Sequence, residues 1–170
     1  MSRRVLIGSL AGLAVFSLGF ATRGLMGGAA DPAPRVTGIG GIFFKCKDPK
    51  AMRAWYGRHF GMPMNAYGAM MEFRGSDPPH AKGYLQWSPF GERTTYFAPS
   101  TKEFMINYRV NDIDGLVAAL RRDSVTVLDT IERFDYGSFV HVLDPEGNKI
   151  ELWEPLDSSF TRLYEGETVK

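Results

Sequence analysis

Histidine and cysteine side chains often hold metals or move protons, and this 170-residue chain has three histidines and one cysteine. The single cysteine, Cys46, excludes an intramolecular disulfide framework and a cysteine-rich zinc or iron–sulfur site. His59 falls in a predicted helix and His80 in a proline-flanked loop, so neither belongs to a predicted strand. His141 does fall in a strand, and three roles stay open for it: hydrogen bonding within the sheet, metal ligation and acid–base chemistry.

Polar and aromatic side chains alternate along three predicted strands and therefore share one face of each. These candidates for a ligand site are Phe43, Lys45, Asn107, Arg109, Glu151 and Trp153. Lys45 and Arg109 could bind an anionic ligand from two sides, but buried charges usually have partners, which favours pairing with acids such as Glu151. Further aromatic residues could line the mouth of a pocket or simply pack in the core. They are Trp87, Phe90, Tyr96, Phe97 and Tyr136.

Several other chemistries have no motif in the sequence. No Ser-His-Asp order is present, and no glycine-rich loop follows a strand, which argues against acyl transfer and nucleotide binding. The chain carries 20 Lys and Arg against 19 Asp and Glu, a formal net charge of +1. This balance provides no broad basic field and argues against nucleic acid as a partner.

The first 30 residues have the composition of an export leader. Arg3 and Arg4 precede a run without charge over residues 5–21, which is slightly short for a membrane span. The Ser-Arg-Arg start resembles a bacterial twin-arginine signal; a general secretory signal and an uncleaved membrane anchor are the alternatives. We therefore expect an exported protein, periplasmic or anchored facing outward, with membrane contact only through residues 5–21 if they are retained. Residues 31–37 read as a linker.

Cleavage of this leader is expected after Ala30, because Gly28 and Ala30 supply the small residues that a signal peptidase requires. The mature protein would then begin at Asp31. Intact-mass or N-terminal sequence analysis of the exported protein tests this, and a chain that still begins with Met1 would contradict it.

The body of the chain repeats one order of elements. Strands are predicted at residues 40–46, 63–73, 83–88, 104–110, 126–131, 138–143 and 149–153, and helices at 49–60 and 113–122. A shift of 64 residues superposes Ile42 on Ile106 and the helix-capping Asp48 on Asp112. The repeat predicts an α+β domain made of two similar modules, and residues 156–170 read as a C-terminal tail.

Two motifs resemble those of the vicinal oxygen chelate superfamily, which includes glyoxalase I, the extradiol dioxygenases and the bleomycin and fosfomycin resistance proteins. The first is the strand and helix start around Asp48, with Trp55 and Tyr56; the second is the closing segment 144–155, Asp-Pro-Glu-Gly-Asn-Lys-Ile-Glu-Leu-Trp-Glu-Pro. The resemblance implies two tandem βαβββ modules over residues 38–155. Their strands would form one curled mixed sheet around a cavity, preceded by the export-signal helix.

The resemblance also implies a divalent metal in the cavity, but most ligand positions hold other residues. The ligand of the first strand falls on Gly41 and its counterpart on Met105, while the closing motif keeps Glu151. The fourth position falls on Leu85 or Gln86. A lone carboxylate does not hold a catalytic divalent ion, which usually has three or four protein ligands, so the cofactor stays unknown.

Three functions remain open from the sequence. The first is binding of a small molecule between the modules, as in the bleomycin-sequestering members and without a metal. The second is a metal-dependent lyase, isomerase or dioxygenase that uses Glu151. If Glu151 is buried without a metal, it could instead serve as a general base or hydrogen-bond donor. The third is an envelope interaction domain without a small ligand, and a homodimer is compatible with each.

Overall fold

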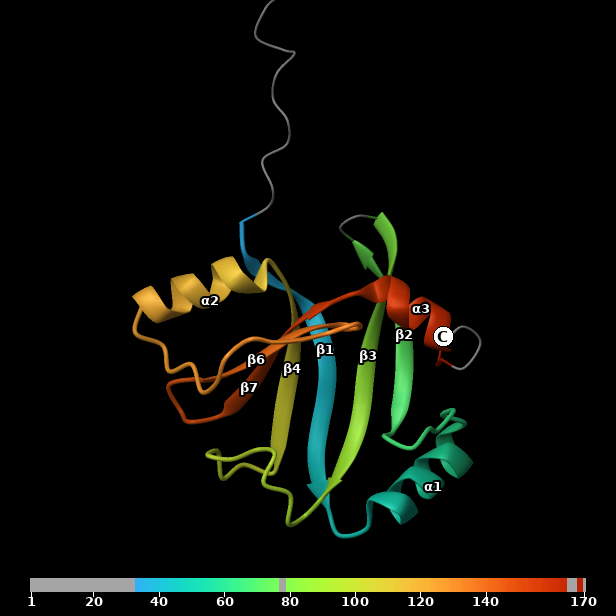
Figure 1. Ribbon diagram of the computed structural model, residues 1–170. Helices are drawn as coiled ribbons and strands as arrows, with labels where there is room; N and C mark the ends of the chain where they lie inside the picture. The colour runs from blue at the N-terminus through green and yellow to red at the C-terminus, as the bar shows by residue number, and fades with distance from the viewer. Residues whose placement is uncertain (1–32, 77–78, 165–167, 170) are drawn as a thin grey trace, which may run out of the picture. The chain divides into compact units, whose positions relative to one another are not determined.

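Seven strands form one mixed sheet in the order β2-β3-β1-β4-β7-β6-β5 in the computed structural model, which describes residues 33–76, 79–164 and 168–169 (Figure 1). The strands are β1 (Arg35–Cys46), β2 (Ala69–Ser76), β3 (Pro79–Gly91), β4 (Phe104–Asn111), β5 (Glu132–Phe134), β6 (Gly137–Leu143) and β7 (Lys149–Pro155); the helices are α1 (Pro49–Phe60), α2 (Ile113–Arg122) and α3 (Asp157–Tyr164). The predicted leader, residues 1–30, lies outside the described residues. Among the residues that are described, no helix has the length and apolar character needed to cross a membrane.

Three strands of each half have matching positions around the central antiparallel pair β1–β4, and β5 extends the second half beyond β6. β1 lies parallel to β3, as β4 lies parallel to β7. β2 then pairs antiparallel with β3, as β6 does with β7. The predicted α+β class and the mixed sheet are therefore confirmed. Among the described residues, however, the first module has the order βαββ, and only the second has the expected order βαβββ. Figure 1 shows β6 and β7 running across the direction of β1 and β4, so the sheet curls.

Two predicted strands differ in the structure, each for a local reason. The stretch 63–73 starts as a turn, because the Asn65 side chain accepts hydrogen bonds from the backbone N–H groups of Tyr67 and Gly68. β2 therefore begins only at Ala69. The stretch 126–131 is not a strand: Val127 makes an isolated bridge to Val142, and the short β5 follows instead.

The predicted ends of the domain also change. β1 begins at Arg35, inside the expected linker 31–37, because its first residues pair with β4. The expected tail 156–170 contains α3, and the backbone of Val169 exchanges hydrogen bonds with β2 at Met70 and Glu72. Both ends of the described chain therefore belong to the folded domain.

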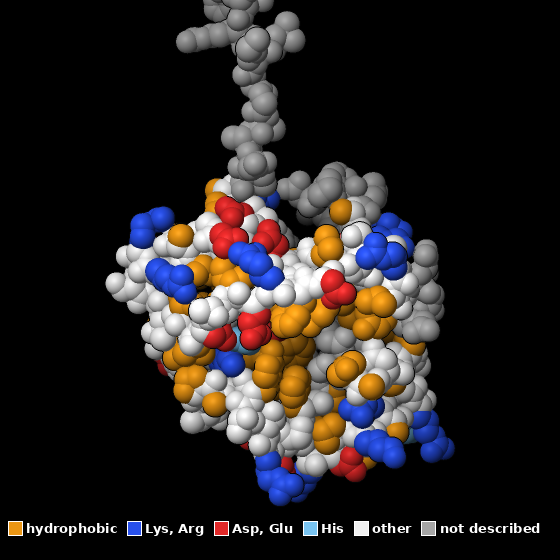
Figure 2. Space-filling model, in the orientation of Figure 1, with side chains coloured by type: hydrophobic (Ala, Val, Ile, Leu, Met, Phe, Trp, Pro, Cys, Tyr) orange, Lys and Arg blue, Asp and Glu red, His pale blue; other side chains and the backbone are white. Residues whose placement is uncertain are grey.

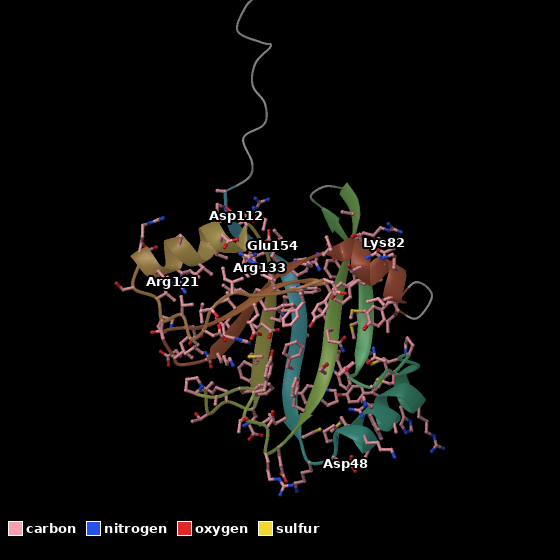
Figure 3. All side chains as sticks on the ribbon, in the orientation of Figure 1. Asp48, Lys82, Asp112, Arg121, Arg133 and Glu154 are labelled. Carbon is pink, nitrogen blue, oxygen red and sulfur yellow. The ribbon has the colours of Figure 1, made fainter. Side chains whose placement is uncertain are left out.

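The helices pack unequally on the sheet. The apolar face of α2 joins a core cluster of Val110, Ile113, Val117, Val140, Val142 and Leu152. Glu154 on β7 accepts from the backbone N–H groups of Asp112 and Ile113 and so satisfies the N-terminus of α2 (Figure 3). By contrast, none of the residues of α1 is buried, although Asp48 caps its start and Gly61 its end.

Candidate functional site

The pairing of the strands places five residues in a row across the middle of the sheet. Gln86 of β3 lies beside Gly41 of β1, Gly41 beside Asn107 of β4, Asn107 beside Glu151 of β7, and Glu151 beside His141 of β6. Residues that are paired in register project to the same face of a sheet. The row therefore brings both modules to one place on the curled surface.

The structural counterpart of Gly41 is Asn107, and not Met105 as the superposed helix caps indicate. Met105 lies opposite Phe43 and is fully buried with Phe97. The reason is that the spacing from this row to the helix cap differs between the modules: Gly41 precedes Asp48 by seven residues, whereas Asn107 precedes its own capping aspartate by five. A superposition that is anchored on the caps is therefore two residues out of register within the sheet.

Glu151 is the centre of a buried hydrogen-bond network, with only 3% of its surface exposed. Its Oε1 accepts from Asn107 Nδ2 at 2.6 Å, and its Oε2 accepts from the Tyr96 hydroxyl. His141 Nε2 lies 3.0 Å from the same Oε2, and His141 Nδ1 lies 2.6 Å from Oδ2 of Asp129. The imidazole therefore bridges two carboxylates, an arrangement that its doubly protonated form satisfies best because both nitrogens then donate.

The surroundings shift the ionisation of these groups. Burial lowers the pKa of His141, but hydrogen bonds to Glu151 and Asp129 outweigh it and raise this pKa above the ordinary 6.5. Burial and the Glu151 charge raise the pKa of Tyr96 and keep its hydroxyl protonated as a donor. Burial lowers the pKa of Lys149, which donates to the backbone carbonyl of Tyr96 at 2.7 Å.

A cavity of about 150 Å³ lies against this network. Its walls are mainly apolar and aromatic, and are formed by Gly40, Phe43, Met70, Gln86, Asn107, Tyr136, Phe139, Glu151, Trp153, Phe160 and Tyr164. Two buried polar atoms of lining residues, Asn107 Oδ1 and Trp153 Nε1, have no hydrogen-bond partner within the described part of the chain. A ligand in this cavity could supply those partners. Figure 2 shows hydrophobic side chains gathered at the centre of the face in view.

Helix α3 closes one side of the cavity with Phe160 and Tyr164. The Phe160 ring packs edge-on against Trp153, with ring centroids 5.1 Å apart. Arg109 Nη2 donates to Asp157 at the start of α3, at 2.5 Å. Arg109 therefore fixes α3 over the site.

The structure gathers five of the predicted site residues at the cavity and places three elsewhere. The cavity residues are Phe43, Gln86, Asn107, Glu151 and Trp153. Trp87 packs between Phe44 and Tyr56 of α1, because it pairs with Ile42 on the opposite face of β1. Lys45 lies over the Phe97 ring, and Arg109 forms an ion pair with Asp157. The expected pairing of Arg109 with an acid is thus confirmed, with Asp157 in place of Glu151.

Three network residues, His141, Tyr96 and Asp129, had either no role or an unresolved one in the sequence-based prediction. The position of His141 could have been found from the turn 144–148, because a hairpin around it pairs Leu143 with Lys149 and therefore His141 with Glu151. Tyr96 and Asp129 lie in irregular segments, and periodicity gives no signal for them. Of the other predicted aromatics, Tyr136 lines the cavity, and Phe90 stacks on Tyr96.

The donors of this site do not fit a divalent metal ion. The row offers one carboxylate, two side-chain amides and an imidazole, and both carboxylate oxygens already accept hydrogen bonds from protein groups. The His141 nitrogens face two carboxylates. No three His, Cys, Asp or Glu side chains among the described residues converge as a metal site would require. The chemistry of the site is therefore derived from its own side chains.

Comparison with known proteins identifies a family to which this fold belongs. The family model of the Glyoxalase/Bleomycin resistance protein/Dioxygenase superfamily matches residues 38–152. The chain belongs to this superfamily. No curated protein matches the sequence.

Solved structures with the same fold include methylmalonyl-CoA epimerases. One is a variant from Streptomyces coelicolor in complex with 2-nitronate-propionyl-CoA; it is 20% identical, with a TM-score of 0.53, over 72% of this chain and 99% of that one. Another, in complex with methylmalonyl-CoA and NH4+, is 20% identical with a TM-score of 0.52, over 72% and 96% of the two chains. At this identity the likeness shows the fold alone.

The bridging position of His141 predicts a pH-dependent stability. Its pKa is raised in the folded state, so its stabilisation is complete below the ordinary value of 6.5 and is lost as the pH rises through the raised value. Each unit by which this pKa is raised corresponds to about 1.4 kcal/mol. We expect the free energy of unfolding to fall with pH above about 6.5. Glu151, Asp129, Tyr96 and Lys149 face the imidazole and set this response.

Urea unfolding at a series of pH values, with NMR titration of the His141 ring, measures this dependence. The variant Asp129→Asn should bring the His141 pKa down and flatten the profile. An unchanged profile in that variant would contradict the bridging role.

Proposed function

We propose that this domain binds a compact small molecule in the cavity beneath α3, without a metal ion. The observation that carries the proposal is a cavity with aromatic walls and a buried carboxylate at its edge. Its neighbour Asn107 has an acceptor atom that no described residue pairs with. Ligand sites typically combine apolar walls with a few placed polar groups. The family includes both binding proteins and enzymes, so the fold alone does not choose between them.

The cavity also defines a ligand class. An engineered protein cavity of about 150 Å³ binds benzene, so the size suits a single ring. Asn107 Oδ1 and the second lone pair of Glu151 Oε1 accept hydrogen bonds, which favours a ligand that donates through O–H or N–H. Lys45 and Arg109, the candidates for an anionic ligand, lie outside the lining. We therefore infer a flat, neutral or cationic ligand with a hydrogen-bond donor.

Gly40→Ala is expected to block binding, because a Cβ atom at Gly40 would lie 2.2 Å from Asn107 Oδ1 and 2.7 Å from the Trp153 ring. Gly91→Ala is the matched control, since a Cβ atom there has nothing within 4 Å. Isothermal titration with phenol, and with benzoate for comparison, measures the effect. We expect phenol to bind the native protein and the control variant, and its affinity to fall at least about tenfold, or 1.4 kcal/mol, in Gly40→Ala.

Two results would contradict the proposed site. One is equal binding of phenol by Gly40→Ala and Gly91→Ala, which would place the ligand elsewhere. The other is stronger binding of benzoate than of phenol, which would mean that the buried carboxylate does not set the selectivity.

Metal-independent proton transfer is a second candidate, favoured by the path from solvent to the cavity. The Asp129 side chain is 41% exposed, His141 connects it to Glu151, and Glu151 lines the cavity. Glu151 Oε1 could take a proton from a bound carbon acid and return one. The Asp129–His141 pair would meanwhile hold the counter-charge and exchange protons with solvent.

Deuterium exchange into acetylacetone, followed by proton NMR, tests the second candidate. We expect the native protein to accelerate the exchange and Glu151→Gln to abolish the acceleration. Binding without any acceleration would reject proton transfer and leave the proposed binding function standing.

We also propose that the domain works outside the cytoplasm. The support is the leader sequence alone, with its two arginines and the charge-free run of residues 5–21. The mature N-terminus, determined as described above, is the test.

A further inference from the structure

Helix α1 carries an exposed aromatic and basic surface that the site does not use. Trp55 is 50% exposed and Phe60 is 63% exposed, and their rings pack together with centroids 5.4 Å apart. Lys47, Lys50 and Arg58, in or next to the same helix, are exposed too. We call these five residues the α1 surface. Exposed aromatic clusters on a monomer often mark a surface that contacts a partner.

Basic residues are concentrated in the segment of the sequence that contains α1. Residues 45–60 hold five Lys and Arg and one acid, whereas residues 61–170 hold 11 Lys and Arg and 17 Asp and Glu. The one acid, Asp48, is occupied in capping α1, where its side chain accepts from the Ala51 N–H. Figure 2 shows Lys and Arg side chains along the lower edge of the molecule, where Figure 1 places α1. The α1 surface is therefore a cationic patch on an otherwise acidic domain.

The basic side chains of this patch are not part of an ion pair in the described part of the chain. Lys47, Lys50 and Arg58 form no ion pair with any described residue. Arg133 and Arg109, by contrast, are paired with Asp114 and Asp157. Unpaired cations around exposed aromatic rings suit an anionic partner.

A lipid surface fits this combination better than a second copy of the chain. Facing α1 surfaces of two copies would bring two sets of like charges together, which opposes self-association. Tryptophan and phenylalanine partition into the interfacial region of a membrane, while nearby Lys and Arg interact with anionic headgroups. We propose that the α1 surface binds membranes that contain anionic lipids, with Trp55 and Phe60 inserted among the headgroups.

This contact would be additional to the one expected through residues 5–21. The experiment therefore uses residues 33–170, which form a compact unit apart from residues 1–32. Vesicles of phosphatidylcholine with phosphatidylglycerol are compared with vesicles of phosphatidylcholine alone, by co-sedimentation. Tryptophan emission provides a second readout, because Trp87 and Trp153 are only 8% and 3% exposed, so a blue shift on vesicle binding reports Trp55.

Lys50→Gln with Arg58→Gln should weaken binding to the anionic vesicles about twentyfold, since each basic residue near such a surface contributes roughly fivefold. Trp55→Ala with Phe60→Ala should weaken it at least tenfold. The matched control is Arg121→Gln with Arg122→Gln, two exposed basic residues of α2 at the opposite end of the domain (Figure 3). This control should bind as the native domain does, and circular dichroism verifies that each variant is folded.

The native domain provides a test that needs no variant, because added salt should release it from the vesicles. The proposal is overturned if the native domain ignores anionic vesicles, binds phosphatidylcholine equally, or loses the same affinity in the α2 control. Sedimentation velocity tests the alternative that the α1 surface binds a second copy of the chain. If the native domain is a dimer and the variant Trp55→Ala with Phe60→Ala is not, the α1 surface binds a second copy of the chain, and the proposal of membrane binding is overturned.

Discussion

Glu151→Leu is expected to lower the free energy of unfolding by about 3 to 5 kcal/mol, the usual cost of removing one member of a buried charged network. The loss is large because three donors converge on this carboxylate: the Asn107 amide, the Tyr96 hydroxyl and the His141 imidazolium. All three would keep their protons and lose their acceptor. Urea unfolding at a fixed pH below 6.5 measures the loss, and phenol binding should disappear with it.

The variant Glu151→Gln removes the negative charge of this side chain and keeps its shape, so it measures the contribution of the charge to stability. A flipped Asn107 amide could present Oδ1 to the new amide group, so the network could re-form without the negative charge. The expected decrease in the free energy of unfolding is therefore smaller, about 1 to 2 kcal/mol. Glu103→Leu, at an exposed glutamate, is the matched control and should change stability by less than about 0.5 kcal/mol. Similar losses for the leucine and glutamine variants would contradict a network centred on this carboxylate.

Arg109→Met should detach α3 from the cavity and reduce stability by about 2 to 3 kcal/mol, because it leaves Asp157 without its cation and removes Arg109 from two aromatic rings. The guanidinium carbon lies 5.2 Å from the Trp153 ring and 5.6 Å from the Phe73 ring. Once α3 is free, Phe160 no longer closes the cavity. Phenol affinity should therefore fall together with stability.

Hydrogen exchange locates this effect, since faster exchange should be concentrated in α3 and spare β4. Arg133→Met is the matched control, because its pair with Asp114 is exposed on both sides, at 54% and 64%. Such surface pairs contribute about 0 to 1 kcal/mol. Equal losses in the two variants, or protection of α3 in Arg109→Met, would contradict the role of Arg109 as the anchor of α3.

The site illustrates which positions a sequence can locate. Asn107 and Glu151 were identified because they alternate on regular strands, where a period of two assigns a face. For Trp87 the sequence left open the mouth of a pocket or the core, and the structure packs it between Phe44 and Tyr56, since its strand partner Ile42 lies on the other face of β1. Tyr96 and Asp129 come from irregular segments on either side of the site. Their contacts with Glu151 and His141 join residues 55 and 12 positions apart.

The sequence alone determined the duplicated α+β architecture and the superfamily. Both follow from local information: the repeat of strand, capping aspartate and helix, and the closing motif that ends near Glu151. It also showed that most of the expected metal-ligand positions hold other residues, such as Gly41, which offers no side chain, while Glu151 is kept.

Only the tertiary structure decided what occupies the site instead. Strand register placed Asn107 opposite Gly41, and two irregular segments brought Tyr96 to Glu151 and Asp129 to His141. Helix α3, which lies in the stretch expected to be a tail, supplies Phe160 and Tyr164 to the wall of the cavity, and Arg109 binds Asp157 at its start. These outcomes depend on pairings between distant segments, whose energies come from burial and complementary charge in three dimensions, and no local pattern encodes them.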